Sequence, residues 1–253
     1  MRTKLSIFAI CILLSTIVLA QDRNPMYYGF DATLSGFGNT SFRRNIPLRN
    51  YYDGYSSLNI YTFGRRYQVG GKFAIFSKNE KVGFETGLRY ALHFKKIEAA
   101  DGNGFTENYL YLQNTTNTNS VDYYRITKVI QNTGYLGVPL ELVLLPMSKN
   151  KFCRIYFKLG VELNVRIHEN VHVKAFDSQF KDAVKSIGKD FKKSDVYYTT
   201  WYAGIGMQFG KPGEQKFSLQ FLFPYLTNEK SSGIIDTNDI IGFTFEYKLP
   251  VKR

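Results

Sequence analysis

The chain has 253 residues and a formal net charge of +12, and 44% of its residues are hydrophobic. Its mean hydropathy of −0.25 argues against a helical membrane protein. The same conclusion follows from the sequence after residue 21, where no stretch approaches the roughly 18 uninterrupted apolar residues of a membrane-spanning helix. A membrane β-barrel is not excluded, since its strands carry apolar residues only at every second position. The one cysteine after residue 21 is Cys153, which excludes an internal disulfide.

Residues 1–21 have the pattern of a secretory signal peptide. Arg2 and Lys4 form a basic start, an apolar run follows, and small residues near Ala20 end it. The alternative is a membrane-spanning helix, but the apolar run is shorter than the ~20 residues that a span requires. We therefore expect the segment to be cleaved and residues 22–253 to be exported as one barrel domain.

After this segment the dominant pattern is an alternation of apolar and polar residues with a period of two. In residues 81–95, for example, Val82, Phe84 and Leu88 share one face of an extended chain, while Glu85 and Arg89 share the other. Such alternation indicates β-strands and excludes helices there. Eight segments follow the pattern, at residues 27–38, 66–77, 81–95, 134–145, 152–168, 196–209, 216–226 and 240–249.

The connections between these segments alternate in length. Short polar turns lie at 78–80, 147–151 and 211–215, and long connections lie at 39–65, 96–127, 170–195 and 227–239. Short periplasmic turns and long extracellular loops are typical of outer-membrane barrels. The sequence therefore predicts an all-β, antiparallel, up-and-down transmembrane β-barrel of about eight strands.

The third long connection contains a helical pattern within residues 176–193. Phe176, Val184 and Ile187 are among the apolar residues that recur at helical spacing, with lysines between them. Asp177 or Ser178 could cap the start of this short amphipathic helix. It could lie on the membrane surface, cover the barrel mouth or pack on its own loop.

Alternation alone does not decide which face of the barrel is apolar, because a secreted lipocalin-like barrel has an apolar interior. Three features favour lipid outside: bulky polar residues of both signs, aromatic residues near strand ends, and strands of about ten residues. An eight-stranded barrel is just wide enough for side chains to fill it, so we expect the charged residues to pair inside. The candidate ion-pairing residues of the lumen are Lys72, Glu85, Arg89, Glu141, Lys158, Glu162, Arg166, Glu246 and Lys248.

Several stretches resemble the PorT-type outer-membrane β-barrel family of Gram-negative bacteria. They are YQVGG at 67–71, FETGLRY at 84–90, YLGVPLEL at 135–142, FKLGVEL at 157–163, YAGIG at 202–206 and IGFTFEY at 241–247. The most particular is YLGVPLEL, because Pro139 lacks a ladder donor and should mark a bulge or bend. The end of the sequence, LPVKR at 249–253, departs from many such barrels in lacking a terminal aromatic residue. The resemblance implies a barrel of the cell outer membrane, in a structural or accessory role or within a secretion or envelope assembly.

The histidines are the remaining candidates for catalysis or metal binding. His93 and His168 are expected on the polar face, and His168 could join Glu162 or Glu169 in a Ser/His/acid arrangement. No nucleophile motif accompanies them, and His168 with His172 lacks a third metal ligand. We therefore expect no enzyme activity, no catalytic residue, no metal and no cofactor.

Basic residues concentrate in two of the long connections. These residues are Arg43, Arg44, Arg49, Arg65 and Arg66 near the first, and Lys174, Lys181, Lys185, Lys189, Lys192 and Lys193 in the third. Outer-membrane lipid and the phosphates of lipopolysaccharide are natural counterions for such loops, and envelope proteins are candidate partners. A solvated charged surface needs no partner, and export counts against nucleic acid.

The expected function is therefore that of a non-enzymatic outer-membrane barrel with a filled, ion-paired lumen. One alternative is a narrow pore or a small-ligand-binding barrel, and another is a lipid-A-modifying enzyme. Ligand-binding residues, the physiological role and the oligomeric state are not predicted by the sequence.

Overall fold

The computed structural model describes residues 24–42, 48–49, 60–99, 109–113, 123–146, 152–191, 193–223, 226–228 and 233–251. The predicted signal peptide lies outside the described residues, as do Arg43, Arg44 and Lys192 of the basic loops. No helix of the described chain is long and apolar enough to cross a membrane.

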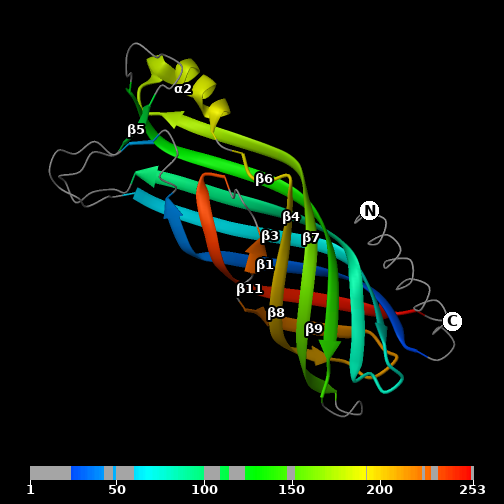
Figure 1. Cartoon of the computed structure of the whole chain (residues 1–253). Coiled ribbons are helices and arrows are strands. Elements are labelled where there is room, and N and C mark those ends of the chain that lie inside the picture. The colour runs from blue at the N-terminus through cyan, green and yellow to red at the C-terminus, as the bar shows by residue number, and fades with distance from the viewer. Residues whose placement is uncertain are drawn as a thin grey trace.

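Eight long strands of the described chain close into a barrel (Figure 1). They are β1 (Met26–Phe42), β3 (Ile60–Phe76), β4 (Val82–Ala99), β6 (Tyr123–Leu144), β7 (Cys153–Ala175), β8 (Tyr197–Phe209), β9 (Lys216–Leu222) and β11 (Ile235–Pro250). Each strand pairs antiparallel with the next, and β11 returns to pair with β1, for example at Tyr247 and Phe30. The predicted antiparallel up-and-down barrel is confirmed, and each predicted segment forms one of its strands.

The wall of the barrel has unequal height. β6 and β7 contain 22 and 23 residues, whereas β8 and β9 contain 13 and 7. The wall of β3, β4, β6 and β7 therefore rises beyond β8 and β9 at the end away from the short turns (Figure 1). Two short strands, β2 (Leu48–Arg49) and β5 (Leu110–Gln113), add to this wall beside β6, while a third, β10 (Leu226–Asn228), pairs with β8. The predicted long loops are thus partly strand, and we call this tall part of the wall the extension.

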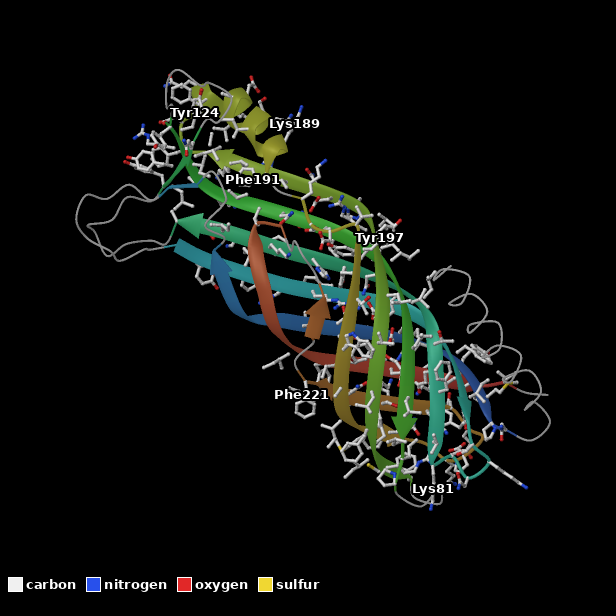
Figure 2. All side chains as sticks on the ribbon, viewed as in Figure 1. Lys81, Tyr124, Lys189, Phe191, Tyr197 and Phe221 are labelled. Carbon is white, nitrogen blue, oxygen red and sulfur yellow. The ribbon has the colours of Figure 1, made fainter. Side chains whose placement is uncertain are left out.

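The two faces of the wall differ in polarity. Phe30, Leu159 and Trp201 point outward, and 51%, 54% and 57% of the surface of these residues is exposed. Figure 2 shows Tyr197 and Phe221 likewise pointing away from the wall. The inward positions carry buried polar and charged side chains. Since a water-soluble barrel buries apolar residues inside, this arrangement is the inverse of a lipocalin-like one.

The polarity of the two faces is reversed in the extension. There the inward residues form a buried apolar cluster, while the outward residues include charged groups such as Lys96 and Lys174 beside aromatic rings such as Tyr61 and Tyr123. The helical segment, which comprises η1 (Ser178–Phe180), α2 (Lys181–Ile187) and η2 (Gly188–Asp190), packs onto this cluster. The cluster contains Ile97, Ala99, Leu110, Leu112, Ile126, Val129, Val173, Val184, Ile187, Phe191, Ile234 and Ile235. The predicted helix therefore exists and covers the inner side of the extension.

Asp177 occupies the predicted N-cap position of η1, but the capping bond does not form. Ser178 is already the first residue of η1. The Asp177 carboxylate instead accepts hydrogen bonds from the Arg125 guanidinium at 2.9 and 3.0 Å. The charged partner on β6 provides stronger hydrogen bonds than a backbone amide.

A register shift between β6 and β7 moves one predicted site residue to the other face. The shift lies at Gly134 and Tyr135 and leaves one extra residue on β7 near Ile167. After it, His168 is exposed on the outer face, where its Nε2 atom lies 2.9 Å from the hydroxyl of Tyr90. The prediction that His168 lies on the polar inner face is therefore wrong.

Pro139 does not produce the predicted bulge. It pairs in register with Glu162 of β7. Pro139 instead affects the pairing of β6 with its other neighbour, β4. This pairing is interrupted between Leu140 and Gly137, and the register is the same on both sides of the interruption. The Thr86 hydroxyl donates a hydrogen bond to the Pro139 carbonyl at 2.9 Å across this interruption.

Candidate functional site in the barrel lumen

The centre of the lumen holds a network of ion pairs around Lys72. Its ammonium lies 3.0 Å from Asp31 of β1, 3.4 Å from Glu85 of β4, 2.5 Å from Glu141 of β6 and 2.8 Å from Glu246 of β11. One lysine thus joins carboxylates of four strands that are far apart in the sequence. All these side chains are almost completely buried.

Two further lysines share the same carboxylates. Lys158 of β7 lies 2.8 Å from Glu85, 3.2 Å from Glu141 and 3.3 Å from Glu246. Lys248 of β11 pairs with Glu85 and lies 2.9 Å from Glu246. Carboxylate oxygens of Glu85, Glu141 and Glu246 approach one another within 4.8 Å, a spacing that could hold a metal ion. The ammonium groups instead balance their charge.

Arg89 extends the network toward the extension. Its guanidinium pairs with Asp31, and it lies 2.6 Å from Glu141 and 3.0 Å from Glu162. The hydroxyl of Tyr202 accepts a hydrogen bond from Arg89 at 2.9 Å and donates one to Glu141. A buried charge whose partner is removed costs about 3–5 kcal/mol, so these residues hold the strands in one arrangement.

The structure places the predicted lumen residues at two levels. Eight of them belong to this central network, and the ninth, Arg166, does not. Arg166 lies nearer the rim, where it is 2.8 Å from Glu169 and also donates to the carbonyl of Ser194. Arg66 was assigned by sequence to the basic first loop, but it is fully buried in the lumen and lies 2.8 Å from Glu162.

Glu80 closes the end of the lumen at the short turns, and no sequence pattern identifies it. Its carboxylate accepts hydrogen bonds from Tyr27 at 2.6 Å, Arg154 at 2.8 Å and Lys216 at 2.7 Å. Burial raises the pKa of Glu80, but Lys216 and these hydrogen bonds outweigh burial and hold the pKa below its usual value. The turn thereby places the negative charge of Glu80 between the cations Arg154 and Lys216 of the barrel wall.

The histidines do not form a catalytic group. His93 is buried between Tyr135 and Tyr198, with ring centroids at 4.8 and 5.9 Å, and its Nε2 atom lies 3.2 Å from the Tyr198 hydroxyl. His168 lies on the opposite face of the wall with Tyr90. His172 is exposed on β7 beyond the register shift. A Ser/His/acid arrangement through His168 is therefore absent from the described lumen.

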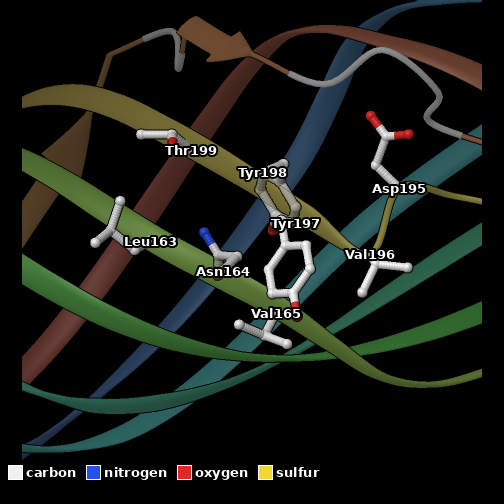
Figure 3. A pocket seen from close by; sticks show the side chains of 8 residues that line it. All are labelled: Leu163, Asn164, Val165, Asp195, Val196, Tyr197, Tyr198 and Thr199. Carbon is white, nitrogen blue, oxygen red and sulfur yellow. The ribbon is translucent and has the colours of Figure 1, made fainter. Parts of the chain in front are cut away.

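A cavity of about 610 Å³ lies at the rim where β7 and β8 meet (Figure 3). Its lining residues are Leu163, Asn164, Val165, Asp195, Val196, Tyr197, Tyr198 and Thr199. Lower on the barrel wall, a second cavity of about 500 Å³ lies among residues of β4, β6, β7 and β8, and its lining includes Leu159, Trp201 and Ala203. The cavity at the rim combines apolar walls with polar groups, which is the composition of small-ligand sites.

Comparisons with known proteins give no family. No protein-family model and no curated protein matches the chain, so the resemblance to the PorT-type family is not confirmed. Solved structures that match include Ail, the attachment invasion locus protein of Yersinia pestis, in complex with the heparin analogue sucrose octasulfate. The identity is 12%, the match covers 91% of this chain and 100% of that one, and the TM-score is 0.40. Neisserial surface protein A matches at 6% identity, with 88% and 96% coverage and a TM-score of 0.38.

Proposed function

We propose that the chain is a non-enzymatic β-barrel of the bacterial outer membrane, with a filled lumen and a structural or accessory role in the cell envelope. The observation that carries the proposal is the inverted barrel: an apolar outer wall around buried ion pairs. Only a surrounding apolar medium makes such a wall stable. In this proposal residues 1–21 are a cleaved signal peptide that directs export.

The arrangement of polar groups supports the absence of catalysis. A hydrolase needs a nucleophile and a base within hydrogen-bond distance of each other. His93 and His168 lie on opposite faces of the wall, and His93 is enclosed by the rings of Tyr135 and Tyr198. The central carboxylates are neutralised by Lys72 and Lys158. An unchanged lipid-A mass spectrum after over-expression is the expected result, and a new lipid-A species would contradict the proposal.

A finer proposal follows the resemblance to the PorT-type family, namely that the barrel belongs to an envelope or secretion assembly. The extension supports it, because a rigid wall that rises beyond the rest of the barrel offers a surface for other proteins. Co-purification from native envelopes in mild detergent tests this proposal. Recovery of stoichiometric partner proteins is expected, and recovery of the barrel alone would contradict it.

The second candidate function is a small-ligand-binding barrel, which the rim cavity beside Asn164 and Tyr198 favours. A narrow pore is not favoured, since Arg89, Lys72 and their carboxylates fill the central section. Planar-bilayer conductance separates filled and open lumens. We expect no single-channel current from the wild-type protein, and steady ion-selective openings would show that the lumen conducts.

A further inference from the structure

The outward residues of the extension mark the level at which lipid should end. On β4 the apolar outward residues end at Phe94, and Lys96 and Glu98 follow on the same face. Over the same stretch the inward residues Ile97 and Ala99 become buried and apolar. A face that is apolar in lipid and polar in water changes character at the boundary of the hydrocarbon region. The boundary on β4 therefore lies close to Lys96.

Cations gather on the outer face at and just above this level. We call Arg65 of β3, Lys96 of β4, Lys128 of β6 and Lys174 of β7 the basic collar. The strands carrying them are consecutive in the sheet, and Lys128 stands directly opposite Lys174. Like charges in opposite positions repel each other unless a counterion lies between them. Glu98 of β4 lies on the same face, where it forms an ion pair with Lys96 and stands directly opposite Lys128.

Aromatic rings hold two of these cations near the wall. The Arg65 guanidinium lies 4.7 Å from the ring centroid of Phe63, and the Lys96 ammonium lies 5.8 Å from that of Tyr61. Aromatic and basic side chains together are typical of the membrane–water interface. The inner side of the same wall packs on the apolar cluster, so the collar sits on a fixed surface rather than on a loop.

We propose that the basic collar binds the phosphate groups of the lipids that surround the barrel in the outer leaflet. The proposal rests on the proposed function, because it requires the apolar wall to lie in a bilayer. A lipid is favoured over a soluble polyanion because the collar faces sideways among apolar residues of the outer face: Arg65 stands opposite Phe94, and Lys96 stands opposite Phe63 and Ile130. A phosphorylated lipid can contact the basic collar with its phosphates and the apolar wall with its acyl chains. Once one of these contacts has formed, the other is made within the same complex and is therefore favoured.

The test uses the full chain folded into phosphatidylcholine vesicles that contain no lipid A, phosphorylated lipid A or dephosphorylated lipid A. The measured quantity is the midpoint temperature of unfolding. The variant is Lys96→Gln with Lys128→Gln. The matched control is Lys185→Gln with Lys189→Gln, which removes the same charge from exposed residues of the helical segment.

We expect phosphorylated lipid A to raise the midpoint of the wild type and the control equally. The collar variant should show less than half of that shift, because each lysine near an anionic surface contributes measurably to binding. High salt should reduce the shift. An undiminished shift in the collar variant, or an equal shift with dephosphorylated lipid A, would overturn the proposal. So would an equal shift caused by soluble dextran sulfate. Failure of the chain to enter vesicles would instead refute the proposed function.

Discussion

Glu80 shows how a single residue of a turn can contribute to the lumen. Its backbone has a φ of 52°, a left-handed conformation that L-residues other than glycine rarely adopt. This conformation costs roughly 1–2 kcal/mol. The ion pairs with Arg154 and Lys216 offset it, because they place opposite charges in contact where water is excluded. The strained backbone is thus maintained by the contacts of its own side chain.

Replacing Glu80 by glutamine should destabilise the barrel by about 3 kcal/mol, because two buried cations then lack a counter-charge. Urea unfolding in vesicles measures the change, and Lys78→Gln in the same turn is the control, since Lys78 is exposed. The pKa of Glu80 is lowered in the folded state. Its stabilisation is therefore present above the unfolded pKa of about 4.3 and lost as the pH falls through the folded pKa. Wild type and variant should converge in acid, and a constant difference would contradict this account.

Alternation predicted much of the lumen at the residue scale, because a period of two assigns every second side chain to the same face. The same rule places Asp31 inside, between the outward residues Phe30 and Ala32, so its place was available from the sequence. The place of Glu80 could not be inferred from the sequence, because it depends on the geometry of the turn. His168 was misplaced because one extra residue in a strand reverses the faces of everything after it.

At the scale of the element, the predicted strands ended too early. The alternation predicts the strands only where their apolar residues point outward, and its polarity reverses where the apolar residues point inward. In β4 the alternation continues through Ile97 and Ala99 with reversed polarity. The strand is the same, but in the proposed membrane barrel its environment changes from lipid to water. The helical segment was predicted because its apolar stripe has a period of 3.6, whereas its partners on five strands (β4, β5, β6, β7 and β11) could not be inferred from local sequence.

Replacing Ile187 by aspartate should detach the helical segment from the extension. Ile187 is 5% exposed and packs in the apolar cluster, and burying an unpaired carboxylate there is costly. Ser186→Asp is the matched control, because Ser186 is exposed in the same helix. Limited trypsin digestion should cut Ile187→Asp faster at the lysines of this helix. Equal rates in the two variants would show that the helix does not depend on this packing.

For the whole molecule, the inverted barrel requires a medium that favours apolar surface. Leu159 points outward from β7 and is 54% exposed. Leu159→Arg should therefore cost about 2–4 kcal/mol if the residue lies near the middle of a bilayer. Unfolding in vesicles measures this cost, with Leu159→Ala as the control for lost volume. A tolerated arginine at Leu159, together with a large penalty at the inward Asn164, would reverse the assignment of the faces.

The most direct test of the lipid-facing wall uses the one tryptophan of the chain, Trp201. It lies on the outer face of β8 and is 57% exposed. The folded protein is placed in vesicles whose lipids carry bromine on their acyl chains, and tryptophan fluorescence is recorded. We expect strong quenching by these lipids and little quenching by iodide in the buffer. Quenching by iodide without quenching by the brominated lipids would contradict the membrane barrel.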